Sequence, residues 1–308
     1  MEKLTLGLEW FLNPDHVPFL VAQEYGWFEE VGIELELVEP EEHLDAVDEI
    51  ERGEMDLAIT EPLHLVEDRA ADKPVVGFAR FLHTNGGVMY LADSGIERPR
   101  DMAGKRIQYP GAPGPGGPVI VQTMIEADGG ECDPAAFEAV NNGFHHTDAL
   151  IDDKADLATL VFFNFEVLEA RYRGHAVDFF ALKDWGVPDF CQLILIAHPD
   201  SLEARRPVIE RFLSVLRRGI DFLHQRPQKA REIYFRRTDT DWDSPLMNAI
   251  FQATLPCFTF DLQMAPEYYV ELADWMAHTE LIERTHRPDD YWTNDLVGPS
   301  LAPHTSAG

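Results

Sequence analysis

Three side chains near the N-terminus are of the types that hold a flat, nitrogen-rich ring. Trp10 offers an aromatic face, Asn13 an amide and His16 an imidazole, all within one turn between a strand-like run and a helical run. Rings stack on aromatic faces and hydrogen-bond to amides and imidazoles. In open α/β sheets, ligands bind at the carboxyl ends of strands, where this turn lies. Alternatively, Trp10 packs in the core, Asn13 shapes the turn and His16 only opens the helix.

A second candidate pair follows the strand-like run DLAIT. Glu61 and His64 come directly after it, at the end that would open into a crevice. A carboxylate accepts hydrogen bonds from an exocyclic amine, and a neutral imidazole bonds a hydroxyl or a ring nitrogen. Alternatively, Glu61 is an ordinary residue before Pro62 and His64 belongs to the first turn of a helix.

The third candidate is the glycine-rich turn PGAPGPGG, which Tyr109 precedes and in which Gly111 is the first glycine. Backbone amides at the start of the following helix are able to hold an anion. No GK[ST] follows, so this is not a P-loop. If the turn binds phosphate, the ligand is phosphorylated; the alternative is a flexible surface turn.

The fourth candidate group follows the apolar run LATLVFF. Asn164 and Glu166 are expected to project from the end of this strand into a cleft. Glu166 would accept two hydrogen bonds from an aminopyrimidine edge, or would simply favour the start of its own helix. Phe163 would form the second wall of an aromatic sandwich, or would belong to the core.

Metal and cysteine chemistry are not expected. His145 and His146 are adjacent and have no acid or cysteine at ligand spacing. The three cysteines, Cys132, Cys191 and Cys257, are far apart and contain no CxxC pair. Cys191 has no recognisable partner base, so we expect no nucleophilic role for it.

Strand-like and helix-like segments alternate along the chain, which predicts mainly parallel sheets covered by helices. Two such units would be joined near residues 90–92, with a strand returning near residues 195–197. We therefore expect residues 1–91 and 196–298 to form one lobe and residues 92–195 the other. The tail 299–308 has little apolar pattern, and we expect it to be disordered.

Composition limits the classes of partner. The chain has 308 residues and a formal charge of −30, which argues against binding nucleic acid through bulk electrostatics. No apolar run approaches the roughly 20 residues of a membrane span. The N-terminus shows no leader pattern. We expect a periplasmic or otherwise extracytoplasmic protein if a signal segment is missing from this sequence, and a cytoplasmic protein otherwise.

Five segments match a known family in order: LEWFLNPDHVPFLVAQEYGWFEEVGIELEL, GEMDLAITEPLHLV, KRIQYPGAPG, DALIDDKADLATLVFFNFEVLEA and WGVPDFCQLILIA. The chain resembles the pyrimidine-binding solute receptors of ABC transporters and the related yeast-type thiamine-pyrimidine synthases. The resemblance implies the α/β class and a type II periplasmic-binding-protein fold, in which a two-strand hinge joins two α/β lobes around a cleft. It also implies a small heteroaromatic ligand, most simply a thiamine-type pyrimidine, and an ABC permease as partner.

The two branches of this resemblance differ in the residues that they carry. In the synthase branch, a lysine four residues before a histidine binds pyridoxal phosphate, and the histidine is consumed as a substrate. Here the histidine position is His64, but the lysine position is Thr60, which has no amine for a Schiff base. The cysteine-rich cluster of the synthases is also reduced to Cys191. We therefore expect a binding protein without a cofactor; the alternative is a cytoplasmic enzyme that uses pyridoxal phosphate and His64.

Overall fold

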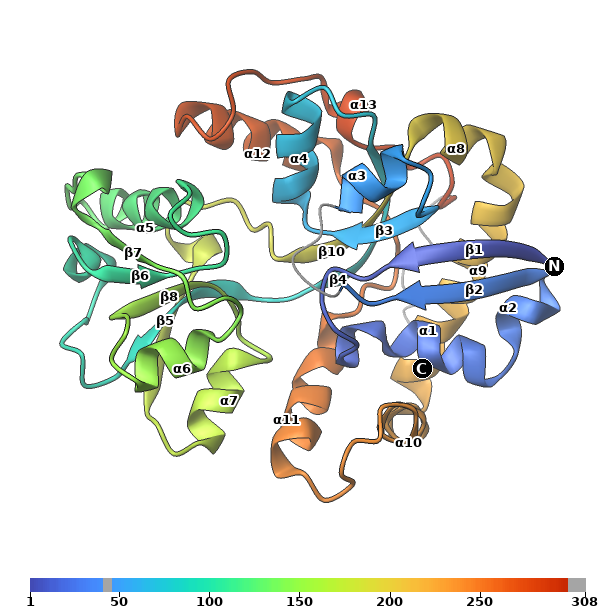
Figure 1. The fold of residues 1–308 in the computed structure, drawn as a ribbon, viewed down its shortest axis with the longest axis horizontal. Helices are drawn as coiled ribbons and strands as arrows, with labels where there is room; N and C mark the ends of the chain where they lie inside the picture. Colours follow the sequence, from blue (N-terminus) through green and yellow to red (C-terminus); the bar gives the residue numbers. More distant parts are fainter. Residues whose placement is uncertain (41–45, 299–308) are drawn as a thin grey trace, which may run out of the picture.

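The computed structural model describes residues 1–40 and 46–298, which form two lobes, each built on one five-stranded sheet (Figure 1). The sheet of the first lobe has the order β2-β1-β3-β10-β4. Its strands are β1 (Glu2–Gly7), β2 (Ile33–Val38), β3 (Leu57–Thr60), β4 (Val76–His83) and β10 (Gln192–Ala197). The sheet of the second lobe has the order β7-β6-β8-β5-β9. Its strands are β5 (Gly86–Leu91), β6 (Arg106–Gln108), β7 (Glu138–Val140), β8 (Leu157–Phe162) and β9 (Val177–Ala181).

Both sheets are mixed. β1 is parallel to β2 and β3, whereas β10 is antiparallel to β3 and β4. In the second lobe, β6 is parallel to β7 and β8, and β5 is antiparallel to β8 and β9. The two lobes therefore share one plan, in which a single antiparallel strand lies inside an otherwise parallel sheet, as expected for the α/β class.

The burial of the strands explains their sequences. In β2, Ile33 and Leu35 are buried while Glu34 and Glu36 face solvent, so the run alternates with a period of two. β10 reads QLILIA and is buried along its whole length, because it lies between two strands and is covered on both faces.

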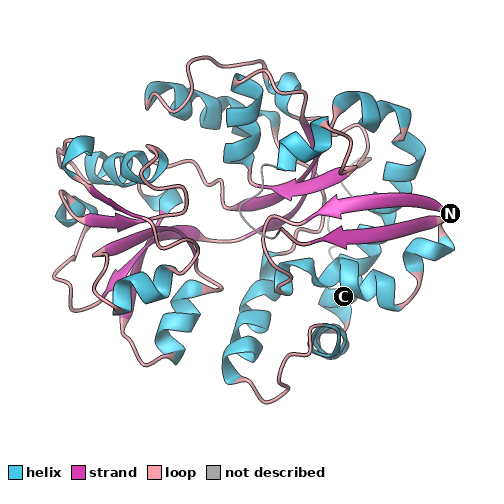
Figure 2. Cartoon of the chain, viewed as in Figure 1, coloured by secondary structure: helices cyan, strands magenta, loops and turns pink. Residues whose placement is uncertain are grey.

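Helices cover both faces of each sheet (Figure 2). In the first lobe they are α1 (Val17–Glu24), α2 (Trp27–Glu30), α3 (Ala46–Glu51), α4 (Pro62–Ala70), α8 (Pro199–Ala204), α9 (Arg206–Gln225), α10 (Pro227–Arg237), α11 (Pro245–Thr254), α12 (Pro266–His278) and α13 (Pro288–Tyr291). In the second lobe they are α5 (Gly116–Ala127), α6 (His146–Ile151) and α7 (Glu166–Tyr172). Short 3₁₀ turns are η1 (Pro14–His16), η2 (Pro99–Met102), η3 (Pro134–Ala136), η4 (Leu182–Asp184) and η5 (Leu255–Cys257).

The C-terminal helices complete the first lobe. α9 and α10 pack on α1, and α12 and α13 pack on α4. α9 approaches α1 closely because residue 219 is a glycine: a Cβ there would lie 2.6 Å from the carbonyl oxygen of Pro18. No helix in residues 1–40 and 46–298 is long and apolar enough to cross a membrane.

Two segments join the lobes. Residues 84–85 connect β4 to β5, and residues 185–191 connect η4, which follows β9 and packs on β5 of the second lobe, to β10. The two connections are hydrogen-bonded to each other, since the amide of Thr84 donates to the carbonyl oxygen of Cys191 at 3.0 Å.

The predicted lobe boundaries are wrong in detail. We expected the first crossing near residues 90–92, but β5 pairs with β8 and β9 inside the second sheet, so the crossing is at residues 84–85. The sequence HTNGG between β4 and β5 is an ordinary turn signal, and only strand pairing places β5 in the second sheet. β10 belongs to the first sheet from Gln192 onward, so the second lobe ends before residue 195. The tail predicted to be disordered, 299–308, lies outside the described residues.

Candidate ligand-binding cleft

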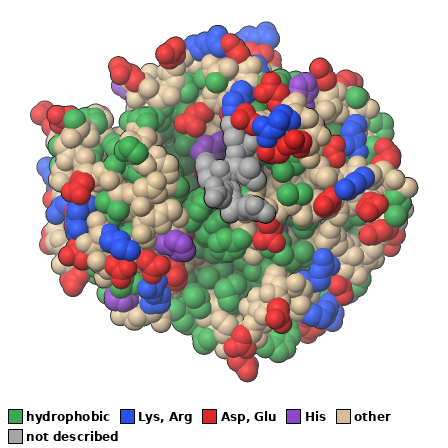
Figure 3. All heavy atoms as spheres, viewed as in Figure 1, with side chains coloured by type: hydrophobic (Ala, Val, Ile, Leu, Met, Phe, Trp, Pro, Cys, Tyr) green, Lys and Arg blue, Asp and Glu red, His purple; other side chains and the backbone are tan. Residues whose placement is uncertain are grey.

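A cavity of about 640 Å³ lies between the lobes. The first lobe contributes the residues after β1, β2 and β3 and the start of α4; the second contributes the loop after β6, the end of β8 and the starts of α5, α6 and α7. In Figure 3, hydrophobic side chains and a histidine line the hollow between the lobes. Strand carboxyl ends from both sheets therefore open into one cleft, which is where such folds bind ligands.

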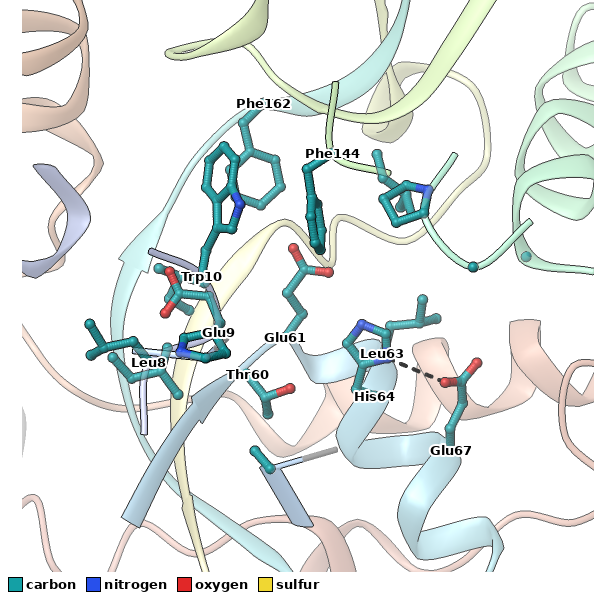
Figure 4. A pocket seen from close by; sticks show the side chains of 18 of the residues that line it. Leu8, Glu9, Trp10, Thr60, Glu61, Leu63, His64, Glu67, Phe144 and Phe162 are labelled. Carbon is teal, nitrogen blue, oxygen red and sulfur yellow. Dashed lines mark hydrogen bonds and ion pairs between the residues drawn. The ribbon is translucent and has the colours of Figure 1, made fainter. Parts of the chain in front are cut away.

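Aromatic rings from both lobes meet in the cleft. The ring of Trp10 lies 5.8 Å from that of Phe144, measured between centroids and with an interplanar angle of 45°. Phe162 also lines the cavity, and Figure 4 shows the three rings grouped together. For a ligand ring to stack between two aromatic side chains, their ring planes must lie about 7–8 Å apart, which is twice the optimal carbon–carbon contact distance. A sandwiched ligand must therefore displace Phe144 from Trp10.

The predicted second wall, Phe163, lies elsewhere. Its side chain is 37% exposed, packs on Phe179 at 5.6 Å and lies under the guanidinium of Arg171 at 5.8 Å. Side chains on a strand point to alternate sides, so Leu160 and Phe162 face the cavity and Phe163 faces away.

Asn13 and His16 support the cleft wall from behind and are not among the residues that line it. The amide oxygen of Asn13 accepts from the amide of Asp15 at 2.8 Å. The backbone N–H of Asn13 donates to Nδ1 of His16 at 3.1 Å, and Nε2 of His16 donates to the carboxylate of Glu9 at 3.0 Å. The turn thus holds the Glu9 carboxylate at the cavity wall.

Asp15 lies in the same turn, faces the cavity and is only 2% exposed. Its Oδ1 is buried without a hydrogen-bond partner in the described part of the chain. Burial raises the pKa of this carboxyl to about 8, and the charges of Glu9 and Glu166 act in the same direction. Below about pH 8, Asp15 is therefore mostly a protonated carboxyl, which is able to donate as well as accept a hydrogen bond in the cleft.

Thr60, Glu61 and His64 all line the cleft at the end of β3 and the start of α4. Figure 4 shows the Glu61 carboxylate directed toward Trp10 and Phe144. Burial raises the pKa of Glu61 to about 7. Burial lowers the pKa of His64, but the hydrogen bond with Glu67 (3.4 Å) and the nearby carboxylates outweigh it and raise the value to about 9. His64 is thus a cation held by neighbouring acids.

The second lobe supplies Glu166 and His146. Glu166 is 8% exposed, and its Oε2 accepts from the amide of Phe162 at 2.9 Å. Burial raises its pKa to about 7, although that amide bond acts in the opposite direction. His146 is 2% exposed, its Nδ1 has no partner among the described residues, and burial lowers its pKa to about 4. His146 therefore presents a neutral imidazole to the cavity.

Asn164 does not reach the cavity. Its amide oxygen accepts from the hydroxyl of Thr84 at 2.6 Å, and its amide nitrogen donates to Oγ1 of Thr254 at 2.8 Å. All three side chains are buried. Asn164 therefore joins the second lobe to the first connection and to α11 of the first lobe.

The glycine-rich turn forms one wall of the cleft. Tyr109, Gly111 and Gly117 line the cavity, and α5 begins at Gly116. The hydroxyl of Tyr109 donates to the carbonyl oxygen of Gly114 at 2.5 Å, so it is used inside the turn. Gly117 permits this packing, because a Cβ there would lie 2.4 Å from the Tyr109 ring.

The lining residues that sequence reasoning missed include Glu9, Asp15, Phe144, His146 and Phe162. Glu9 and Asp15 belong to the turn that was singled out, so an acidic residue beside Trp10 was an available signal. The position of Phe162 at the cavity could have been predicted from the alternation of side chains along β8. Phe144 and His146 come from the loop before α6, and no local pattern places that loop at the cleft.

The charged residues that line the cleft are mostly acidic. Its described lining holds six carboxylate residues and two histidines, and neither lysine nor arginine. The carboxylates are Glu9, Asp15, Glu61, Glu67, Asp68 and Glu166. Such a lining accepts hydrogen bonds from N–H donors and repels anions such as sulfonate or phosphate. In the described residues, no group of three or more His, Cys, Asp or Glu side chains is arranged to hold a metal.

Two α/β lobes, two connections and a ligand-sized cavity between the lobes define the periplasmic-binding-protein fold. The chain matches the family described as NMT1/THI5 like over residues 13–230 and belongs to it. It superposes on the periplasmic aliphatic sulphonate binding protein SsuA from Escherichia coli with a TM-score of 0.75 and 12% identity, covering 100% of this chain and 97% of that one. The expected fold and family are confirmed.

Relatives by sequence fall into two groups. The formylaminopyrimidine-binding protein of Halalkalibacterium halodurans is 27% identical over 256 residues, which are 83% of this chain and 76% of that protein. The 4-amino-5-hydroxymethyl-2-methylpyrimidine phosphate synthase of Legionella pneumophila is 27% identical over 299 residues, 96% of this chain and 92% of that protein. Binding proteins and synthases are thus equally similar in identity, and residues of the cleft must distinguish them.

Proposed function

We propose that this protein binds a small heteroaromatic solute rich in N–H donors, of the thiamine-type (formyl)aminopyrimidine class, for ABC-type uptake. The observation that carries the proposal is a cleft with an aromatic plate, Trp10, and carboxylates from both lobes, without lysine or arginine in its described lining. The similarity to a formylaminopyrimidine-binding protein supports the same ligand class. Uptake of this kind implies an extracytoplasmic location.

The ligand would be held by stacking and by its amino groups. A pyrimidine on Trp10 gains about 0.5–1.5 kcal/mol beyond the burial of its surface. Glu166 accepts the N–H groups of the amino-pyrimidine edge, while the amide of Phe162 holds its Oε2 in place. Sulfonates are poor candidates despite the fold, because the cleft offers six carboxylates to a charged oxygen and only histidines as cations.

The same carboxylates would couple binding to closure of the lobes. Asp15 belongs to the first lobe and Glu166 to the second, and the charge of Glu166 raises the pKa of Asp15. Two approaching carboxylates resist closure unless one is protonated or a donor lies between them. A ligand with N–H groups on two edges supplies that donor, and so favours the closed form. An ABC permease would recognise the closed form.

The second candidate is a pyrimidine synthase, which the Legionella pneumophila relative favours together with His64 at the start of α4. The cleft does not fit pyridoxal phosphate. Thr60 occupies the position of the Schiff-base lysine, the described lining contains no lysine, and six carboxylates face the space where a phosphate would sit. We therefore place this candidate second.

Calorimetry tests the proposal directly. Wild type is titrated with formylaminopyrimidine, hydroxymethylpyrimidine, thiamine and an alkanesulfonate. We expect saturable binding of a pyrimidine and none of the sulfonate. Trp10→Ala and Glu166→Gln should each weaken binding at least tenfold, a loss of about 1.4 kcal/mol. Trp242→Ala, which removes a half-exposed tryptophan before α11, is the matched control and should bind normally.

Absence of heat with formylaminopyrimidine, hydroxymethylpyrimidine and thiamine would reject the binding-protein proposal. The synthase candidate predicts instead a visible absorbance from added pyridoxal phosphate and single-turnover loss of the His64 imidazole. Intact-protein and peptide mass spectrometry after incubation with pyridoxal phosphate would detect that loss.

A further inference from the structure

A second cavity, of about 360 Å³, lies beside the segments that join the lobes. It shares no lining residue with the ligand cleft. The first lobe contributes β4, β10 and the start of α12, the second lobe contributes η4, and the connection contributes residues 187–189. A molecule bound here would touch both lobes and the segment between them.

Arg80, on β4, lines this cavity with a positive charge that its surroundings compensate poorly. One of its terminal nitrogens donates to the amide oxygen of Gln192 at 3.3 Å, and the carboxylate of Asp261 is 3.9 Å away. Its Nε is buried without a partner in the described part of the chain. A guanidinium keeps its charge in proteins, so a half-buried one with a neutral amide as its closest partner is unfavourable unless an anion is added.

Two further basic residues, His83 and Lys183, line the cavity. Nε2 of His83 lies 2.9 Å from Asp189, which also accepts on its backbone oxygen from Gln192 at 2.6 Å and from Tyr268 at 3.2 Å. Lys183 is exposed at the rim and forms no ion pair with the described residues. The remaining carboxylate of the lining, Glu271, is exposed.

We propose that this cavity is a binding site for a small oxyanion, a phosphate or a carboxylate, held by Arg80 with Lys183 at its mouth. Arg80 offers Nε–H and N–H groups in the planar arrangement that pairs with two oxygens. Because the walls belong to both lobes and to the connection between them, occupancy changes the equilibrium between open and closed lobes. The site is separate from the ligand cleft and acts through the hinge.

The test uses the full chain and two probes, inorganic phosphate and succinate, with sodium chloride adjusted to constant ionic strength. Calorimetry should show saturable binding of at least one probe. Arg80→Gln and Lys183→Gln should each weaken it at least fivefold. Arg284→Gln is the matched control, because Arg284 is an exposed arginine that is paired with Asp72 and does not line this cavity, and it should bind as wild type does.

The result that would overturn the site is the absence of saturable heat with both probes, or equal affinity in wild type and Lys183→Gln, a variant at an exposed position that should fold normally. Small-angle scattering tests the coupling. The radius of gyration of the protein without cleft ligand should change when the anion saturates wild type, and should not change in Lys183→Gln at the same concentration. An identical radius in wild type with and without anion would reject the link to the hinge.

Discussion

The amide nitrogen of Asn164 donates to Oγ1 of Thr254 at 2.8 Å, and this bond joins the two lobes. Asn164 follows β8 in the second lobe, and Thr254 ends α11 in the first. Thr84, in the shorter connection, donates to the other end of the same amide at 2.6 Å. One buried side chain therefore links both lobes and the segment between them, although its sequence position had suggested contact with the ligand.

Replacement of Asn164 should affect stability and lobe motion more than ligand contact. Asn164→Ala leaves the hydroxyls of Thr84 and Thr254 buried without this partner, which should lower the free energy of unfolding by about 1–3 kcal/mol. Urea denaturation measures the change. Gln252→Ala, at an exposed position of α11, is the control and should stay within about 0.5 kcal/mol of wild type. A wild-type urea midpoint for Asn164→Ala would contradict the role of this bond.

The arrangement of the aromatic rings in the cleft leads to a second prediction. Phe144 faces Trp10 across the cleft, whereas Phe163 is on the opposite side of its strand end. Phe144→Ala should therefore weaken binding of the pyrimidine ligand about three- to tenfold, through the loss of one stacked face. Phe163→Ala is the matched control, with the same change in a residue of the same lobe, and should leave the affinity unchanged. Calorimetric titration measures both affinities; a larger loss in Phe163→Ala would contradict this arrangement.

Local patterns predicted most of the elements, because their causes are local. The alternation of β2, the apolar run of β10 and the Ser244–Pro245 start of α11 are local signals for these elements. The boundary between lobes was misplaced because strand pairing decides it, and a strand such as β5 carries no local sign of which sheet it joins. Its place is clear only from contacts in the folded chain: a Cβ at Gly86 would collide with Cys191 of the other connection.

The site was predicted in part for the same reason. Trp10, Thr60, Glu61, His64, Tyr109, Gly111 and Glu166 line the cavity, as residues at strand ends and helix starts tend to do. Asn13, His16 and Asn164 come from the same kinds of position but satisfy buried backbone or side-chain groups instead. Which polar residue supports a wall and which faces the ligand depends on side-chain direction, and that is set by packing between distant segments.

Asp15 should lower the free energy of unfolding of the ligand-free protein while it contributes to ligand binding. Its carboxyl has a pKa of about 8, against an ordinary value of 3.8, chiefly because it is buried. Between those two pH values the native state binds more protons than the unfolded state, so the free energy of unfolding should fall as pH rises from about 4 to 8. Asp15→Asn should flatten this slope and stabilise the ligand-free protein at pH 8, yet weaken ligand binding.

Thermal or urea unfolding across this pH range tests the prediction. Glu126→Gln, a change of the same kind on the exposed face of α5, corrects for the general loss of negative charge. If Asp15→Asn and Glu126→Gln give the same slope, Asp15 is not the origin of the pH dependence.

Ligand affinity should rise with pH, whereas the free energy of unfolding should fall. Glu61 and Glu166 have pKa values of about 7, raised by burial, and only their ionised forms accept hydrogen bonds from ligand N–H groups on every oxygen. Below pH 6 these carboxyls are mostly protonated, and binding must first remove a proton. The affinity should therefore rise between pH 6 and 8, by up to tenfold per pH unit for each proton released, and then level off. Calorimetry in buffers of different ionisation enthalpy measures how many protons are released on binding. In Glu166→Gln the rise should become shallower, since one titrating group is gone; a rise as steep as that of wild type would exclude Glu166 as its source.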